Sequence, residues 1–458
     1  HLGGGNSRQR KFGIEDSADK VYEDWVRYDH RDSRYSDRDL VRAFADENAD
    51  AFEFLVENGV QFQDQATGPQ AASTVRRQGR TVQWPIASER VTHNVTRVGS
   101  GLVRALEKSA RAKGAEILLE HRMTRIIREN QFSGRVLGVS AEHRGTTVNI
   151  RALKGVLVAT GGSSSNVTLR RTFDPRLTEE YQVAGEPWSK QTGDGELAAM
   201  AIGAALWATA NQTKESGNYM SKSRYIGCKW GYSSLIWEPD SPIFDRARAS
   251  GLTILDWQDA ILVNQIGRRF YNELESGYDF FAACLADHGD TSKRNGGGPI
   301  WAIFDAEAVE RERWDPNPPF VDLDGYFFSG DTLAELARNI DNEYQSGPMP
   351  PAALEETLAR YNSFVDTGSD PDFGKDQPRY KIQTPPFYAA WSTPILHDTL
   401  TGLRTNARAQ VMDYHGQVIP GLYCSGESQG GFAQHGLGRC IVFGRIAGRD
   451  AALSGGEV

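Results

Sequence analysis

Cysteine is scarce in this sequence, and its few cysteines stand far apart. The 458 residues contain four cysteines and no CxxC pair, so neither a disulfide scaffold nor a zinc site is implied. We therefore expect no bound metal and a protein of a reducing compartment, the cytoplasm. The four are Cys228, Cys284, Cys424 and Cys440.

Long apolar runs and an excess of positive charge are also missing. No run approaches the ~18 to 20 apolar residues of a membrane span. Lys and Arg number 51 against 60 Asp and Glu, for a formal net charge of −9. This balance argues against nucleic acid or an anionic membrane surface as the main partner. The length allows two or three domains around a large core.

The pattern richest in glycine lies near the C-terminus. An apolar run from Val418 ends at Gly426 and Glu427, a glycine-dense loop follows, and a segment rich in small residues resumes at Phe443. This order predicts a strand, a loop and a helix. Glycines in such a loop let backbone N–H groups approach a flat or anionic ligand closely.

Three further motifs precede this pattern along the chain. They are Val156 to Gly162 (VLVATGG), Thr192 to Gly195 (TGDG) and Gly267 to Glu273 (GRRFYNE). Together with the C-terminal pattern they resemble the fumarate reductase and succinate dehydrogenase flavoprotein family, over nearly the whole chain. The resemblance implies an α/β fold, with a Rossmann-like, glutathione-reductase-like FAD domain and an inserted α+β capping domain, or clamp.

The composition changes at about Thr209, where aromatic residues begin to crowd the sequence. By resemblance, residues 209–397 form the capping domain, while residues 1–208 and 398–458 form the two parts of the FAD domain. Most aromatics of the capping domain are expected in its core, and a minority in a substrate pocket. The opening segment Gly3 to Ser7 resembles the one that follows the family's GxGxxG unit. We expect that unit to lie outside these 458 residues rather than to be lost, because its loss would leave the sheet open.

Periodicity predicts the main elements between these motifs. Helices are expected at residues 35–59, with Asn58 and Gly59 as the stop, at 99–113 and at 350–365. Strands are expected at residues 115–121, 134–142, 147–152 and 155–160.

The resemblance also assigns cofactor contacts. Glu427 would bind the ribityl chain, Met123 would offer its backbone to the adenine, and N–H groups near Cys440 and Ile441 would meet the flavin O2. No histidine or cysteine has a context for a covalent link, so FAD would be held non-covalently. The full set is Gly4, Gly5, Asn6, Ser7, Met123, Ala159, Thr160, Gly161, Gly162, Asp194, Gly426, Glu427, Gly438, Arg439, Cys440 and Ile441.

The catalytic positions depart from the family's fumarate reducers. Gly277 stands where their proton-donor arginine is expected, with Tyr278 beside it, and Asp398 replaces the second histidine of a pair that begins at His397. We take Tyr278 as candidate acid and base, although a tyrosine with a pKa near 10 needs a neighbouring cation or strong donors to act at neutral pH. His435, Arg439 and His397 are further candidates. A purely structural role remains open for Tyr278 and both histidines.

These departures favour a non-fumarate substrate. We predict α,β-dehydrogenation, or the reverse ene-reduction, of a bulky, carbonyl-activated small molecule by hydride transfer with flavin N5, as in ketosteroid dehydrogenase-like flavoproteins. A di- or tricarboxylate, as in the tricarballylate dehydrogenase-like branch, is the alternative that Arg439, Arg404 and an arginine-rich loop keep open. A separate electron acceptor or donor is a further expected partner. The alternative of another class is an inactive flavoprotein-fold scaffold.

Overall fold

The computed structural model describes most of the chain in two compact units. Unit 1 comprises residues 1–169, 191–213 and 398–458, and unit 2 comprises residues 170–190 and 214–397. The described residues are 2–26, 35–62, 90–92, 95–96, 98–183, 190–208, 226–229, 250–252, 254–275, 283–284, 298–318, 320–396, 399–434 and 436–454.

Residues 170–190 group with unit 2, whereas the expected boundary at residue 208 put them in the first domain. Their contacts explain the difference. Val183 forms a parallel bridge with Leu396, and the Glu180 carboxylate accepts a hydrogen bond from the Gly298 N–H at 2.7 Å. Helix α6 (Val167–Phe173) runs across the boundary after Leu169.

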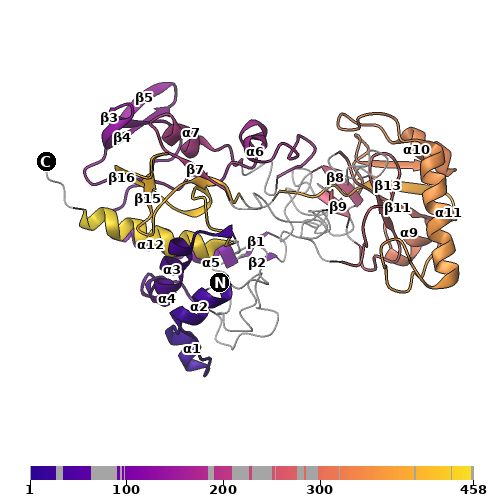
Figure 1. Ribbon diagram of the computed structural model, residues 1–458, viewed down its shortest axis with the longest axis horizontal. Helices are drawn as coiled ribbons and strands as arrows, with labels where there is room; N and C mark the ends of the chain where they lie inside the picture. The colour runs from indigo at the N-terminus through magenta and orange to yellow at the C-terminus, as the bar shows by residue number, and fades with distance from the viewer. Residues whose placement is uncertain are drawn as a thin grey trace. The chain divides into compact units, whose positions relative to one another are not determined.

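Unit 1 combines helices with short sheets (Figure 1). Its helices are α1 (Ser7–Lys11), α2 (Ala18–Val26), α3 (Arg38–Asp46), α4 (Asn48–Glu57), α5 (Val98–Ala112), α7 (Asp194–Met200), the 3-10 helix η4 (Gly426–Ser428) and α12 (Leu437–Leu453). Its strands are β1 (Arg90–Thr92), β2 (Val95–Thr96), β3 (Arg122–Asn130), β4 (Ser133–His143), β5 (Thr146–Arg151), β6 (Val156–Val158), β7 (Leu206–Trp207), β14 (Gly402–Leu403), β15 (Gln410–Met412) and β16 (Val418–Cys424).

Strand β16 is the middle strand of a three-stranded sheet. It pairs in parallel with β6, with Cys424 opposite Val158, and antiparallel with β15. Strands β3, β4 and β5 form an antiparallel sheet, and β4 contacts β16. The expected strands at 134–142, 147–152 and 155–160 and the helix at 99–113 are thus present, and the parallel β6–β16 pair fits the α/β class.

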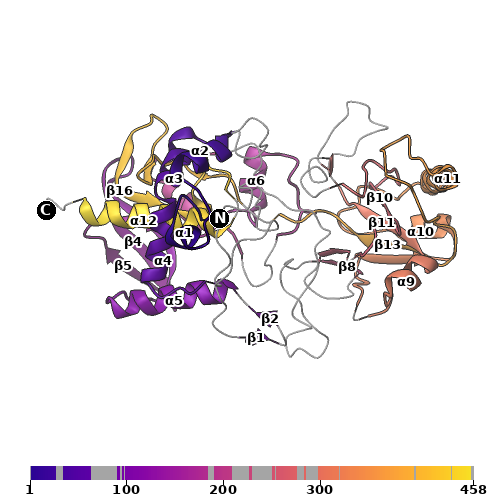
Figure 2. The ribbon, with the colours of Figure 1, turned by 90° about the horizontal axis from the view of Figure 1, so that it is seen from below.

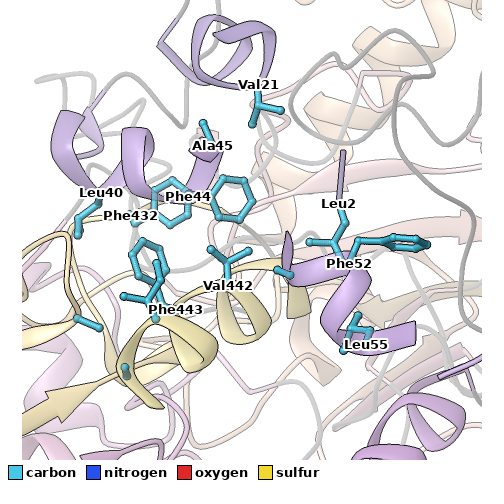
Figure 3. Close-up of a cluster of buried hydrophobic side chains, with 14 of the residues drawn as sticks. Leu2, Val21, Leu40, Phe44, Ala45, Phe52, Leu55, Phe432, Val442 and Phe443 are labelled. Atoms are coloured by element: carbon cyan, nitrogen blue, oxygen red, sulfur yellow. The ribbon is translucent and has the colours of Figure 1, made fainter. Parts of the chain in front are cut away.

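Helices α3, α4 and α12 share one hydrophobic core with the loop that precedes α12 (Figure 3). Phe432 lies at its centre, with ring centroids 5.0 Å from Phe44, 5.4 Å from Trp25 and 5.7 Å from Phe443. Asp37 fixes the start of α3, because its carboxylate accepts from the N–H groups of Asp39 and Leu40. The core thus holds the loop before α12 in place.

Two predicted elements differ from the structure. The expected helix at 35–59 is divided at Glu47, whose carboxylate is held by Arg445 and Arg449 of α12. The expected strand at 115–121 is absent, and its apolar side chains Ile117, Leu118 and Leu119 are exposed. A strand needs a paired backbone, and no described strand pairs with this segment.

Unit 2 is built on an antiparallel sheet of four strands in the order β10 (Ile261–Val263), β11 (Trp301–Asp305), β13 (Phe387–Trp391) and β12 (Phe327–Gly330). Strands β8 (Ile226–Lys229) and β9 (Ser250–Leu252) pair separately. Its helices are α9 (Ala306–Glu312), α10 (Leu333–Asn339) and α11 (Pro351–Thr367), and Figure 2 shows α10 and α11 together beside this sheet.

The described aromatic residues of unit 2 serve mainly as core. Trp301 and Trp391 pack edge to face at 5.6 Å, and Trp314, Tyr326 and Phe327 are buried. Tyr219, Tyr225, Trp230, Tyr232 and Trp237 lie outside the described residues. Among the helices of the described residues, none combines the length and the apolar character needed to cross a membrane.

Candidate functional site

Two glycine turns of unit 1 meet at the ends of the parallel strands β6 and β16. The Ser425 N–H donates to the Val158 carbonyl at 3.1 Å. One turn later, the Ser428 hydroxyl accepts from the Thr160 N–H at 3.2 Å and donates to the Gly161 carbonyl at 2.7 Å. These bonds hold the ATGG turn against the turn that carries Gly426 and Glu427.

The third turn, TGDG, joins the same cluster. The Gly193 N–H donates to the Gly162 carbonyl at 3.2 Å. Thr399 then ties the turns together: its hydroxyl accepts from the Ser163 N–H at 3.1 Å, and its own N–H donates to Glu427 Oε1 at 3.3 Å. Segments more than 200 residues apart are therefore fixed to one another.

Two glycines near these turns have open space beside them. A Cβ added at Gly161, with φ of +84°, or at Gly436, with φ of +80°, would meet no atom within 4 Å. Gly162 is the opposite case, since its Cβ would stand 2.1 Å from the Thr399 hydroxyl oxygen. A tightly packed glycine next to one with open space is compatible with a ligand that approaches the backbone closely, as the expected FAD would.

Glu427 and Arg439 lie beside these turns. The Arg439 side chain is 1% exposed and that of Glu427 is 23% exposed, and Arg439 Nη2 is 3.7 Å from Glu427 Oε1. Arg439 donates to the carbonyls of Thr399 at 2.8 Å and Phe432 at 3.3 Å, and its Nε has no hydrogen-bond partner among the described residues. Most of this guanidinium is therefore used to hold the loop.

The start of α12 brings four predicted contacts together: Gly438, Arg439, Cys440 and Ile441. The N-cap residue Gly436 supplies no side-chain hydrogen bond to the first turn. Of the N–H groups there, that of Arg439 is taken by the side chain of Gln434. N–H groups at a helix start carry partial positive charge and favour an electron-rich ligand.

The opening segment is placed differently. The Gly4 N–H donates to Asp16 at 2.7 Å, the Gly5 N–H to Gln9 at 2.8 Å and the Ser7 N–H to Glu53 at 2.6 Å. Asn6 caps α1 with a reciprocal pair of bonds to Gln9. These backbone donors are engaged within the protein, and their predicted cofactor role stays a prediction.

Met123 and Asp194 complete the described set. Met123 lies in β3 opposite Ala141, and Asp194 begins α7 with its carboxylate 3.4 Å from Arg122 Nε. Ala159 and Thr160 are exposed in the turn after β6. The candidate catalytic residues Tyr278, His397 and His435 lie outside the described residues.

A buried charged cluster in unit 2 includes two residues shortly before Tyr278 in the chain, Arg269 and Glu273. Arg269 contacts Glu273 at 2.9 Å and Asp370 at 3.0 Å, and Lys375 Nζ is 3.3 Å from Glu273. Burial alone would raise the pKa of Glu273, but the charges of Lys375 and Arg269 outweigh it and lower that pKa. The cluster links the segment of Arg269 and Glu273 to that of Asp370 and Lys375.

Sequence reasoning missed Glu196, in the first turn of α7. Its side chain is buried, and burial together with the charges of Glu427 and Asp194 raises its pKa to about 8. A signal was present in the sequence, since Glu196 is the one charged residue in the run from Gly195 to Leu206. Within the described residues, no group of three or more His, Cys, Asp or Glu is placed to hold a metal.

The chain matches the FAD binding domain family over residues 4–216 and 229–438. It is 26% identical to a probable fumarate reductase, Ifc3, of Shewanella frigidimarina over 462 residues, or 98% of this chain and 66% of the relative. It is 27% identical to the 3-oxosteroid 1-dehydrogenase of Mycolicibacterium smegmatis over 402 residues, or 79% of this chain and 63% of the relative. The chain therefore spans just under two thirds of the length of these relatives.

A solved structure shares the fold. The chain superposes on the 3-ketosteroid Δ1-dehydrogenase of Sterolibacterium denitrificans with a TM-score of 0.64, covering 99% of this chain and 91% of that one at 20% sequence identity. This likeness supports an α/β fold with a second domain.

Proposed function

The chain belongs to the FAD binding domain family, and from that premise we propose that it acts as an FAD-dependent oxidoreductase on CH–CH bonds. FAD is the cofactor of this family, and when bound it supplies the acceptor or donor of the hydride in α,β-dehydrogenation or ene-reduction. One observation carries the proposal: the ATGG, TGDG and Gly426–Glu427 turns converge through Thr399 and Ser428 and leave open space beside Gly161.

The residues at this point suit the parts of FAD. Glu427 is partly exposed and can accept hydrogen bonds from ribityl hydroxyl groups. N–H groups in the first turn of α12 can stabilise negative charge at the pyrimidine end of the reduced ring. These assignments to Glu427 and to Cys440 and Ile441 follow the family pattern and belong to the proposal.

For the substrate, we propose a bulky, carbonyl-activated and largely neutral molecule. Arg439, the candidate partner for a substrate carboxylate, is buried and donates to two main-chain carbonyls. Few N–H donors of the Arg439 guanidinium are therefore left for an anionic substrate. A curated relative that acts on 3-oxosteroids is compatible with the same substrate class.

Tyr278 is the proposed acid and base. We expect Tyr278→Phe to lower kcat by about 10²- to 10⁴-fold, the usual contribution of a positioned proton-transfer group, with the flavin spectrum unchanged. Tyr414→Phe is the matched control, because Tyr414 is an exposed tyrosine in unit 1. Equal turnover in the Tyr278 variant and the control would remove Tyr278 from this role.

The function is tested by an absorption spectrum of the purified protein after addition of FAD, followed by anaerobic titration. One arm uses cyclic ketones and enones, and the other uses di- and tricarboxylates. Bleaching of the flavin by a saturated cyclic ketone, or reoxidation of pre-reduced flavin by the enone, supports the proposal. A response to carboxylates alone would overturn the substrate class. If the protein takes up no FAD, the alternative of an inactive flavoprotein-fold scaffold is favoured.

A further inference from the structure

Glu196 is a buried acid for which the described residues supply no cation. The residue is 1% exposed, and neither carboxyl oxygen has a hydrogen-bond partner on another residue in the described part of the chain. A carboxylic acid has one O–H donor to satisfy, and leaving it unmet in the interior is costly. Such a group points to a partner that the described residues do not supply.

The position of Glu196 is set by its neighbour Gly195. A Cβ at Gly195 would lie 2.2 Å from the Thr160 hydroxyl oxygen and 2.5 Å from a Val158 methyl carbon. Helix α7 therefore starts directly against the end of β6 and the ATGG turn. The Thr160 hydroxyl in turn lies 3.2 Å from that of Ser428, next to Glu427. Glu196 thus stands among the three converging turns.

The charges around Glu196 are mostly negative. The charges of Glu427 on η4 and of Asp194 on the same helix raise the pKa of the Glu196 carboxyl. The charge of Glu196 in turn raises the pKa of the Cys424 thiol at the end of β16. Strand β3 contributes Arg122, which is engaged with Asp194, and β14 contributes no ionisable side chain. Burial raises the pKa of Glu196 most, the backbone N–H of Glu196 itself lowers it, and the two carboxylates raise it further. The resulting pKa of about 8 keeps the group mostly neutral at pH 7.

We propose that Glu196 is a further FAD-binding residue, which as a neutral acid donates a hydrogen bond to the oxygen-rich ribityl and pyrophosphate part of the cofactor beside Glu427. The pair then works as one donor and one acceptor. An ionised Glu196 would lose the donor and repel the pyrophosphate. The inference rests on the FAD site proposed above and adds a residue outside the glycine motifs.

The consequence is a pH-dependent affinity. FAD binds the protonated form, so the dissociation constant rises once pH exceeds the pKa of Glu196. With that pKa at about 8, linkage gives a rise of about tenfold between pH 7 and pH 9. Below pH 7 Glu196 stays protonated, so its titration no longer changes the affinity for FAD.

The test measures the FAD dissociation constant of the full chain by flavin fluorescence from pH 6 to pH 9. Glu196→Gln keeps a neutral side chain with a donor, so its dissociation constant stays near the low-pH value of the unaltered protein and loses the rise. Glu196→Leu removes the donor, and binding weakens at pH 7 by about three- to tenfold, as for one lost hydrogen bond. Glu355→Gln, at an exposed position on α11, should keep the rise.

Infrared difference spectra on FAD addition give a second readout, which is obtained on the unaltered protein and does not depend on how tightly a variant binds FAD. A perturbed carboxylic-acid C=O band should appear in the unaltered protein and be absent from Glu196→Gln. The same rise with pH in Glu196→Gln, or unweakened binding in Glu196→Leu, would overturn the proposal while FAD binding itself stands. A protein that binds no FAD at any pH would overturn both.

Discussion

Two buried acids, Glu273 of unit 2 and Glu196 of unit 1, have opposite surroundings. In unit 2, Arg269, Glu273, Asp370 and Lys375 neutralise one another through contacts of 2.9 to 3.3 Å. The Lys375 ammonium also donates to the carbonyls of Trp257 and Ala260. In unit 1, Glu196 is 1% exposed and faces no opposite charge, and neither of its carboxyl oxygens has a hydrogen bond to another described residue.

This difference suggests a structural role for the cluster of unit 2 and a binding role for Glu196. A buried charge whose hydrogen bonds are all made within the protein stabilises the arrangement that makes them, and breaking one partner is costly. A buried polar group left unmatched lowers the stability of the free protein and is expected where a ligand completes it. We therefore regard the cluster of unit 2 as a structural anchor and Glu196 as part of a binding site.

The largest expected effect is on the anchor. Arg269→Met keeps the apolar bulk but leaves Glu273 and Asp370 with only Lys375 as a cation, and should lower the free energy of unfolding by about 3–5 kcal/mol. Urea unfolding at neutral pH measures this loss.

Arg268→Met is the matched control for the anchor. Arg268 pairs with Glu356 at 2.7 Å, but both side chains are exposed, and such pairs contribute less than about 1 kcal/mol. Equal losses in the two variants would show that the buried cluster has no special role.

The second effect concerns Glu196 in the FAD-free protein. Its folded-state pKa of about 8 lies above the ordinary value of 4.5, so between these values the folded protein keeps a proton that the unfolded chain has released. Its contribution to stability is complete below pH 4.5 and is lost as pH rises through 8. Glu196→Gln removes this titration.

We expect the stability of Glu196→Gln relative to the unaltered protein to rise by a few kcal/mol, roughly 2–4, from pH 5 to pH 9. Urea unfolding at pH 5, 7 and 9 measures it, with Glu355→Gln as control. A difference that does not change with pH would mean that Glu196 is already ionised in the folded protein, and the contrast between the units would disappear.

Local sequence predicted the parts of the site that depend on neighbouring residues. Strand β16, the loop after it and helix α12 follow from the apolar run at Val418, the glycines and the segment at Phe443. Helix α11 follows from Leu354, Leu358 and Tyr361 at helical spacing, and all three are buried. Periodicity and turn residues suffice where one face of an element meets the core.

Features that depend on distant residues were not predicted. The break at Glu47 is fixed by arginines almost 400 residues later, and Arg269 meets Asp370 across 101 residues. The segment 115–121 has a strand-like sequence, but no described strand pairs with it. Glu196 was overlooked because TGDG directs attention to Asp194, while the burial of Glu196, two residues later, is decided by the packing of α7 on strands distant in the sequence.

The smallest expected effect compares one tight glycine from each unit. Gly162→Ala would bring a Cβ to 2.1 Å from the Thr399 hydroxyl oxygen, and Gly330→Ala would bring one to 2.5 Å from the Leu336 nitrogen. Both should cost about 1–3 kcal/mol of stability through overpacking, measured by thermal unfolding. Only Gly162→Ala should also weaken FAD binding, because Thr399 links Ser163 to Glu427. Weaker FAD binding in the Gly330 variant as well would mean that the cofactor senses general stability and not the turns of unit 1.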